Sequence, residues 1–186
     1  MNALPIPRLS VEEYLAADLV SDRPLEYHDG EIFPIAEASL RHAAIEVNVG
    51  SLLKQRLSGT TCNVIGTMRV RISQTQYVQP DIIVYCGQPT LTKESEPSLT
   101  NPKVVFEILS PSTADYDYGG KFQLYRQLPS FEEYVLVAQD QPRVEVFRRM
   151  PDGKWLLSTY EGEESTAAVE SLDMQLPLRE IYAQLP

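Results

Sequence analysis

Two acidic residues interrupt stretches of sequence that otherwise have the composition of buried β-strands. Asp81 opens the stretch DIIVY (81–85), and Glu107 lies inside the stretch VVFEIL (104–109). Both stretches are short, rich in β-branched residues and bounded by turn residues, which predicts two buried strands. An unpaired carboxylate in such a strand is costly because it loses its hydration. We therefore expect a positive group between the two acids, either a divalent cation or a lysine.

Lys121 is the nearest lysine that follows, at the end of the sequence DYGGK (117–121), in a helix predicted over about 114–128. Two strand carboxylates can hold Mg²⁺ or Mn²⁺, which prefer oxygen ligands. A lysine beside them can orient a water molecule and stabilise charge in the transition state. The three residues together indicate metal-dependent phosphodiester cleavage. In the alternative, Asp81 caps the turn after Pro80, and Glu107 pairs internally with Lys121 or an arginine.

The charge balance argues against a nucleic-acid substrate. The chain has 26 acidic and 16 basic residues and a net charge of −10, whereas non-specific nucleic-acid binders are usually basic. Arg69 and Arg71, two apart on one predicted strand face, are the best local candidates for contacts with phosphates. An exposed strand face would give the same pattern.

The remaining bulk properties indicate an ordinary globular protein. The 186 residues predict a single domain over 1–186. Cys62 and Cys86 are far apart and have no CxxC spacing, so they indicate no disulfide framework, and with His28 and His42 they give no zinc-site spacing. The first residues lack the order of a signal peptide, and no apolar run approaches the length of a membrane helix, about 20 residues. We expect a cytoplasmic protein with no membrane partner.

The order of predicted elements indicates a mixed α/β sheet flanked by helices. Ser10 and Glu13 form a capping box that begins a helix near 10–18, and Asp29-Gly30 predicts the turn of a hairpin over 25–36. Ser39 caps a longer helix to about Leu57, with apolar positions at Ala43, Val47, Leu53 and Leu57. The strands are predicted near 61–72, 77–85, 103–109, 133–138, 143–149 and 154–160, with a surface loop over 87–102 and a short closing helix from Pro177.

The chain also resembles a known group of enzymes. Pro80-Asp81 followed by Glu107-x-Leu109 resembles the PD-(D/E)xK nuclease superfamily. The stretch VFEILSPST (105–113), then Asp117-x₃-Lys121-x₃-Tyr125 and EYVLV (133–137), resembles more specifically the Uma-type "putative restriction endonuclease" family of bacteria. LEY-x-DGE (25–31) and His42 also match that family's pattern, so the resemblance extends from about residue 8 to 150.

This resemblance implies a restriction-endonuclease-like α/β fold and Mg²⁺- or Mn²⁺-dependent hydrolysis of nucleic acid, with DNA as the expected partner and a homodimer as the expected assembly. Asp81 and Glu107 would be catalytic metal ligands, helped by Glu26 and the backbone carbonyl of Ile108. The superfamily's usual lysine, two residues after the glutamate, is Leu109 here, and Lys121 is its expected replacement.

Three further residues are expected to line the same cleft, namely His42, Asp117 and Tyr125. Two of them have simpler alternative roles. His42 could be a packed helix residue, and Asp117 could cap the helix or hold Lys121 in place. For Glu26 the alternative is a solvent-facing hairpin position. Two other functions stay open for the whole chain. It could be a nuclease-fold binding or assembly module without catalysis, which the net acidity favours slightly, or a metal-dependent hydrolase of a small phosphate ester, which would need no basic surface.

Overall fold

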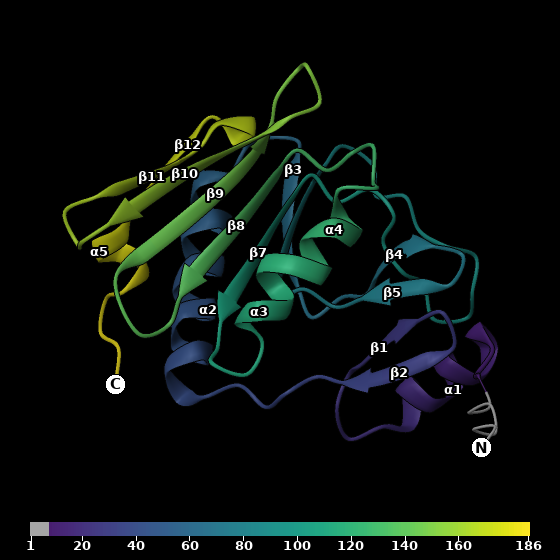
Figure 1. Ribbon diagram of the computed structural model, residues 1–186. Helices are drawn as coiled ribbons and strands as arrows, with labels where there is room; N and C mark the ends of the chain where they lie inside the picture. Colours follow the sequence, from purple (N-terminus) through teal and green to yellow (C-terminus); the bar gives the residue numbers. More distant parts are fainter. Residues whose placement is uncertain (1–7) are drawn as a thin grey trace.

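A six-stranded mixed sheet forms the centre of the protein, as seen in the computed structural model, which describes residues 8–186 (Figure 1). β7 and β8 run parallel, and every other neighbouring pair is antiparallel. In spatial order the strands are β10 (Trp155–Glu161), β9 (Arg143–Arg149), β8 (Glu133–Ala138), β7 (Val104–Leu109), β6 (Ile82–Cys86) and β3 (Cys62–Gly66).

Two smaller sheets accompany it. The four-stranded sheet has the order β2 (Glu31–Pro34), β1 (Leu25–His28), β5 (Gln76–Val78) and β4 (Val70–Ser73). Together with α1 (Val11–Val20) it lies to one side of the central sheet (Figure 1). The third sheet is a hairpin of β11 (Thr166–Val169) and β12 (Met174–Pro177), joined by the 3₁₀ turn η2 (Glu170–Leu172).

Helices cover both faces of the central sheet, as the sequence predicted. One face packs against α2 (Leu40–Arg56), α5 (Leu178–Ile181) and the β11–β12 hairpin. The other is covered by a helical segment made of α3 (Ala114–Tyr116), the π-helical turn η1 (Asp117–Lys121) and α4 (Phe122–Tyr125). β7 and β8 are buried at every position, as expected for strands with helices on both sides. Glu107 is the polar residue within β7, and it faces the segment that carries Lys121.

The local signals near the N-terminus are confirmed. Ser10 and Glu13 form the predicted capping box of α1, and Ser39 accepts a hydrogen bond from the His42 N–H at the start of α2. Asp29 and Gly30 have positive φ angles of 51° and 101°. This is the conformation that a two-residue hairpin turn requires.

The predicted strand over 61–72 is wrong, because it is two strands in two different sheets. β3 ends at Gly66, Thr67 adopts a positive φ of 49°, and β4 begins at Val70. The predicted strand over 77–85 is likewise divided into β5 and β6 around Pro80, which has no N–H to donate to a sheet. The first connection passes from the central sheet to the small one and the second passes back, so the sequence 62–86 links the two sheets.

Two other element predictions need correction. Val47 is exposed on α2, and the buried stripe runs through Ile45, Val49 and Leu53. The β11–β12 hairpin was not predicted, although Ala167, Val169, Met174 and Leu176 alternate as a half-buried hairpin requires.

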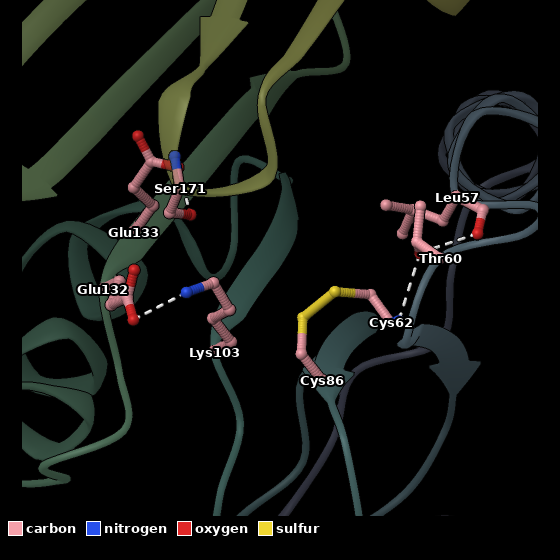
Figure 2. Close-up of a disulfide and its surroundings, with 8 residues drawn as sticks. All are labelled: Leu57, Thr60, Cys62, Cys86, Lys103, Glu132, Glu133 and Ser171. Carbon is pink, nitrogen blue, oxygen red and sulfur yellow. Dashed lines mark hydrogen bonds and ion pairs between the residues drawn. A yellow bond between two sulfur atoms is a disulfide. The ribbon is translucent and has the colours of Figure 1, made fainter.

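The cysteines also differ from the expectation. Cys62 and Cys86 lie directly opposite each other in the β3–β6 register and form a disulfide (Figure 2). The spacing of the cysteines along the sequence did not predict this disulfide, because the antiparallel register of β3 and β6 brings the two residues together. The disulfide attaches the edge strand β3 to β6 at the end opposite Asp81. Over residues 8–186, no helix is both long enough and apolar enough to cross a membrane.

Candidate active site

The two strand acids lie side by side. Ile82 of β6 is opposite Phe106 of β7, so the preceding residue, Asp81, lies next to Glu107 at the edge of the antiparallel pair. The Ile108 N–H donates to Asp81 Oδ2 at 2.7 Å, and the Asp81 N–H lies 3.4 Å from Glu107 Oε2. Each acid is thus held in place by the backbone of the other strand.

Lys121 fills the space behind these acids. Its ammonium nitrogen Nζ lies 2.9 Å from Glu107 Oε1, 3.5 Å from Glu26 Oε1 and 3.7 Å from Asp117 Oδ1. It also donates to the Gln79 carbonyl at 3.2 Å. The lysine, itself 6% exposed, therefore provides a positive charge to three buried acids, and of the two strand acids it pairs with Glu107.

Glu26 projects from β1 into the same place and is not the solvent-facing residue of the alternative interpretation, being 4% exposed. It accepts hydrogen bonds from the Gln79 N–H at 3.0 Å and from the Tyr116 hydroxyl at 2.8 Å. His28 Nε2 lies 3.0 Å from that hydroxyl and 3.5 Å from Glu26 Oε2. The small sheet thus contributes an acid to the site of the two acids of the central sheet, Asp81 and Glu107.

The π-helical turn η1 carries the groups that face Glu26 and Glu107. Its first and last residues, Asp117 and Lys121, are both buried on the sheet side. Between them, Gly120 leaves room for Tyr116, since a Cβ atom at Gly120 would lie 2.9 Å from the tyrosine ring. A Cβ atom at Gly119 would have no neighbour within 4 Å. Such single-turn widenings of a helix are frequent at functional sites.

The remaining predicted cleft residues also reach this region. His42, in the first turn of α2, places Nε2 3.4 Å from Asp81 Oδ2. The Tyr125 hydroxyl donates to Glu107 Oε1 at 3.0 Å, from beneath the carboxylate and fully buried. Tyr125 therefore supports Glu107 and does not face the open cleft.

Arg69 and Arg71 do not join the other residues. Arg69 pairs with Asp18 at 2.7 Å, and Arg71 lies 3.4 Å from Glu94. Neither arginine lines the cleft that contains Asp81 and Glu107. The expectation that they share one exposed strand face is wrong for Arg69, which precedes β4 and is largely buried by its ion pair.

The pKa values of Glu107 and Glu26 are shifted in opposite directions by burial and by nearby charges. Burial raises the pKa of Glu107 well above its usual range, and the nearby Lys121 only partly offsets this. Burial also disfavours the ionised form of Glu26. There, however, the charge of Lys121 and the hydrogen bonds from His28, Gln79 and Tyr116 are stronger, and they lower its pKa to about 2. Burial favours loss of the Lys121 proton, but the surrounding carboxylates outweigh it and raise the lysine pKa.

These residues open into a cleft of about 680 Å³ between the two sheets and the start of α2. Over residues 8–186, no three or more His, Cys, Asp or Glu side chains are grouped as a ready-made metal cage. The donors at the cleft floor are instead two carboxylates, from Asp81 and Glu107, and the backbone carbonyl of Ile108. This set of hard oxygen donors fits Mg²⁺ or Mn²⁺, which keep several water ligands and need few from the protein.

Two residues at the site were missed by the sequence analysis. The sequence did not indicate a role for Tyr116 because its hydrogen-bond partner, Glu26, is 90 residues away in the sequence. Glu46 lies one helical turn after His42 and also lines the cleft. Burial and the charge of Asp81 raise its pKa. The spacing of His42 and Glu46, four residues apart on one helix face, was the available signal.

Comparison with known proteins gives a consistent result. The model of the Uma2 family, described as "Putative restriction endonuclease", matches residues 11–179. Two proteins of Synechocystis sp. are similar along most of their length. "Uncharacterized protein slr1290" is 33% identical over 97% of this chain and 95% of its own, and "Uncharacterized protein sll1609" is 34% identical over 84% and 90%.

A crystal structure of a "putative nuclease" from Anabaena variabilis has the same fold. It superposes with a TM-score of 0.74 over 94% of this chain and 98% of its own, at 17% sequence identity. That level of identity shows the fold alone. The family match over nearly the whole chain, together with this fold, shows that the chain belongs to the Uma2 family of "putative restriction endonucleases".

Proposed function

We propose that this protein is a Mg²⁺- or Mn²⁺-dependent nuclease that hydrolyses phosphodiester bonds of nucleic acid, with DNA as the expected substrate. The observation that carries the proposal is the placement of Asp81 and Glu107 side by side, with Lys121 Nζ 2.9 Å from Glu107. Asp81, Glu107 and the Ile108 carbonyl would hold the cation. When bound, it would lower the pKa of a coordinated water and neutralise charge on the phosphate.

The chain's own groups have separate tasks in this proposal. Lys121 stays protonated because carboxylates surround it, so it acts as a fixed positive charge facing the phosphate and not as a base. Glu26 and Asp117 hold the lysine from two other sides. His42 contacts Asp81 and can accept or supply a proton at the edge of the cleft.

The direct test is cleavage of supercoiled plasmid, single-stranded DNA and RNA in Mg²⁺ or Mn²⁺. Lys121→Ala should keep cation binding and lose about 10²–10⁴-fold in rate, the usual cost of a lost electrostatic contact. Lys121→Arg should recover little, because a guanidinium is larger than the buried space that the ammonium fills. Lys154→Ala is the matched control, since Lys154 is exposed and pairs with Asp152 outside the cleft.

A second candidate is a binding or assembly module that keeps the fold without catalysis. The net charge of −10 favours it. Absence of cleavage by the wild type on all three substrates would select this candidate. Full retention of the rate by Lys121→Ala would instead refute the role proposed for the lysine.

We also propose a homodimer and a cytoplasmic location. The dimer is argued by analogy with compact nucleases of this fold, which commonly pair, and symmetric dimers are the commonest oligomers. Light scattering on the purified protein at several concentrations would decide the assembly, since a monomeric mass throughout would contradict it.

A further inference from the structure

The hairpin that carries Glu26 also carries an uncovered aromatic ring. Phe33 of β2 is the register partner of Glu26 of β1, so both side chains are on the same face of the hairpin. Glu26 is buried at the candidate active site, whereas Phe33 is 46% exposed and lines the cleft. The ring packs against His28, with centroids 5.4 Å apart, and His28 contacts Tyr116.

The residues that follow Phe33 form a mostly apolar side of the cleft. Pro34, Ile35, Ala36 and Ala38 line the same cleft before Ser39 begins α2. The opposite face of β2 is different, because Ile32 pairs with Tyr27 in the buried cluster under α1 and does not line the cleft. Within β2, Ile32 therefore lies on the side of Tyr27 and is 38% exposed, whereas Phe33 lies on the side of the cleft.

The charges of the cleft do not favour a bound phosphate chain. Its basic side chains are Arg23, His42 and Lys121, and its carboxylates are Asp22, Glu26, Glu37, Glu46, Asp81, Glu107 and Asp117. Arg23 pairs with Glu37 at 3.0 Å, His42 lies 3.4 Å from Asp81, and Lys121 is buried among acids. Of the described residues that line the cleft, none offers an unpaired cation for the phosphates flanking the cleaved bond.

We propose that Phe33, supported by His28, is a stacking subsite for an unpaired nucleobase next to the cleaved phosphate. The inference rests on the proposed function and specifies its substrate as single-stranded nucleic acid. Stacking of a base on an aromatic ring contributes to binding separately from contacts with phosphates, and it tolerates any base. A continuous duplex cannot use this subsite, because its bases are stacked on each other.

Binding of a short fluorescein-labelled single-stranded oligodeoxynucleotide, in Ca²⁺ to avoid cleavage, tests the subsite. Phe33→Ala should weaken binding about tenfold, in the range of one lost stacked base. Phe33→Trp should bind like the wild type. Ile32→Ala is the matched control, since Ile32 is the neighbouring residue, is 38% exposed and faces the other way. A 2-aminopurine base in the oligonucleotide should lose fluorescence with the wild type and not with Phe33→Ala.

Several results would overturn the subsite. These are unchanged binding by Phe33→Ala, equal losses in Phe33→Ala and Ile32→Ala, an equal loss on the matching duplex, or no binding of the single strand by the wild type. Plasmid and single-strand cleavage in Mg²⁺, measured in parallel, separates this inference from the proposed function. Cleavage without a Phe33 effect on binding removes the subsite alone. Phe33-dependent binding without cleavage removes the catalytic proposal alone.

Discussion

The hydroxyl of Tyr116 holds the Glu26 carboxylate in place, 2.8 Å from Oε2, and Glu26 in turn faces Lys121. Tyr116→Phe removes that hydrogen bond and leaves the ring where it packs beside Gly120. We expect both the cleavage rate and the melting temperature to fall, the rate by about tenfold, because a hydrogen bond to a charged group contributes about 1.5–3 kcal/mol and this one holds Glu26 against Lys121. Tyr118→Phe, which removes a hydroxyl bonded to Glu145 outside the cleft, should keep the wild-type rate.

Alanine variants at the two adjacent glycines of η1, Gly119 and Gly120, can distinguish the positioning of Tyr116 from the stability of the helical segment. Alanine favours a helix at both positions, and Gly119→Ala, whose Cβ atom has no neighbour within 4 Å, should raise or preserve stability. At Gly120 the close contact with the Tyr116 ring opposes this gain. Gly120→Ala should also displace the Tyr116 ring and lower the rate as Tyr116→Phe does, whereas Gly119→Ala meets no atom and should not. Equal rates for the two alanine variants would contradict the positioning role of Tyr116.

At the scale of single residues, the sequence predicted the acids and the lysine but not all of the residues that support them. Asp81 and Glu107 were visible because a charge in an apolar strand is locally anomalous. Tyr116 carries no such anomaly, and its role depends on a contact between elements far apart in the chain. For Arg69 the sequence suggested a role that the structure does not support. Its charge suggested phosphate contacts, but it pairs with Asp18, which is 51 residues away in the sequence.

At the scale of elements, turn and cap chemistry predicted boundaries well where local hydrogen bonds decide them, as at Ser10, Ser39 and Asp29-Gly30. This chemistry failed to predict boundaries where the pairing of strands decides them. The segment 62–86 passes through both sheets, and an apolar strand contains no information on which sheet receives it. The same pairing brought Cys62 opposite Cys86.

This cross-link gives a prediction for β3, which is an edge strand with β6 as its neighbour in the central sheet. The disulfide spans 24 residues in sequence, so it removes loop entropy from the unfolded chain worth about 3 kcal/mol. Cys62→Ser with Cys86→Ser, or reduction of the wild type, should lower the melting temperature. The cleavage rate at low temperature should not change, because the site lies at the other end of β6. A double variant that melts at the wild-type temperature would show that the cross-link contributes nothing.

At the scale of the whole molecule, stability should depend on acid through Glu26. Its folded pKa, about 2, is below the ordinary value of 4.5. The unfolded chain therefore takes up the proton first, and the stabilisation is complete above about pH 5 and lost as the pH falls toward 2. The shift corresponds to about 3 kcal/mol. In urea unfolding at pH 7 and pH 3, the stability advantage of the wild type over Glu26→Gln should shrink at the lower pH. A constant difference would contradict this linkage.

The cation should also be detectable in the stability of the whole protein. Because burial raises the pKa of Glu107, its ionised form at neutral pH costs folding free energy in the metal-free protein. Glu107→Gln should therefore melt at a higher temperature than the metal-free wild type. Asp81→Asn should do so as well, because it removes a negative charge that raises the Glu107 pKa. Mg²⁺ or Mn²⁺ should raise the melting temperature of the wild type, since a ligand at 100 times its Kd stabilises by about 2.7 kcal/mol.

The same two variants should lose the metal response, because each removes a carboxylate that would hold the ion. Glu37→Gln is the matched control, since Glu37 is an exposed acid at the cleft rim that pairs with Arg23 and is distant from the strand acids in sequence. It should keep the full Mg²⁺-induced shift. If the shift survives in both Glu107→Gln and Asp81→Asn, the ion binds elsewhere. The side-by-side placement of the two acids would then be a matter of folding alone, with Lys121 as their structural counter-ion.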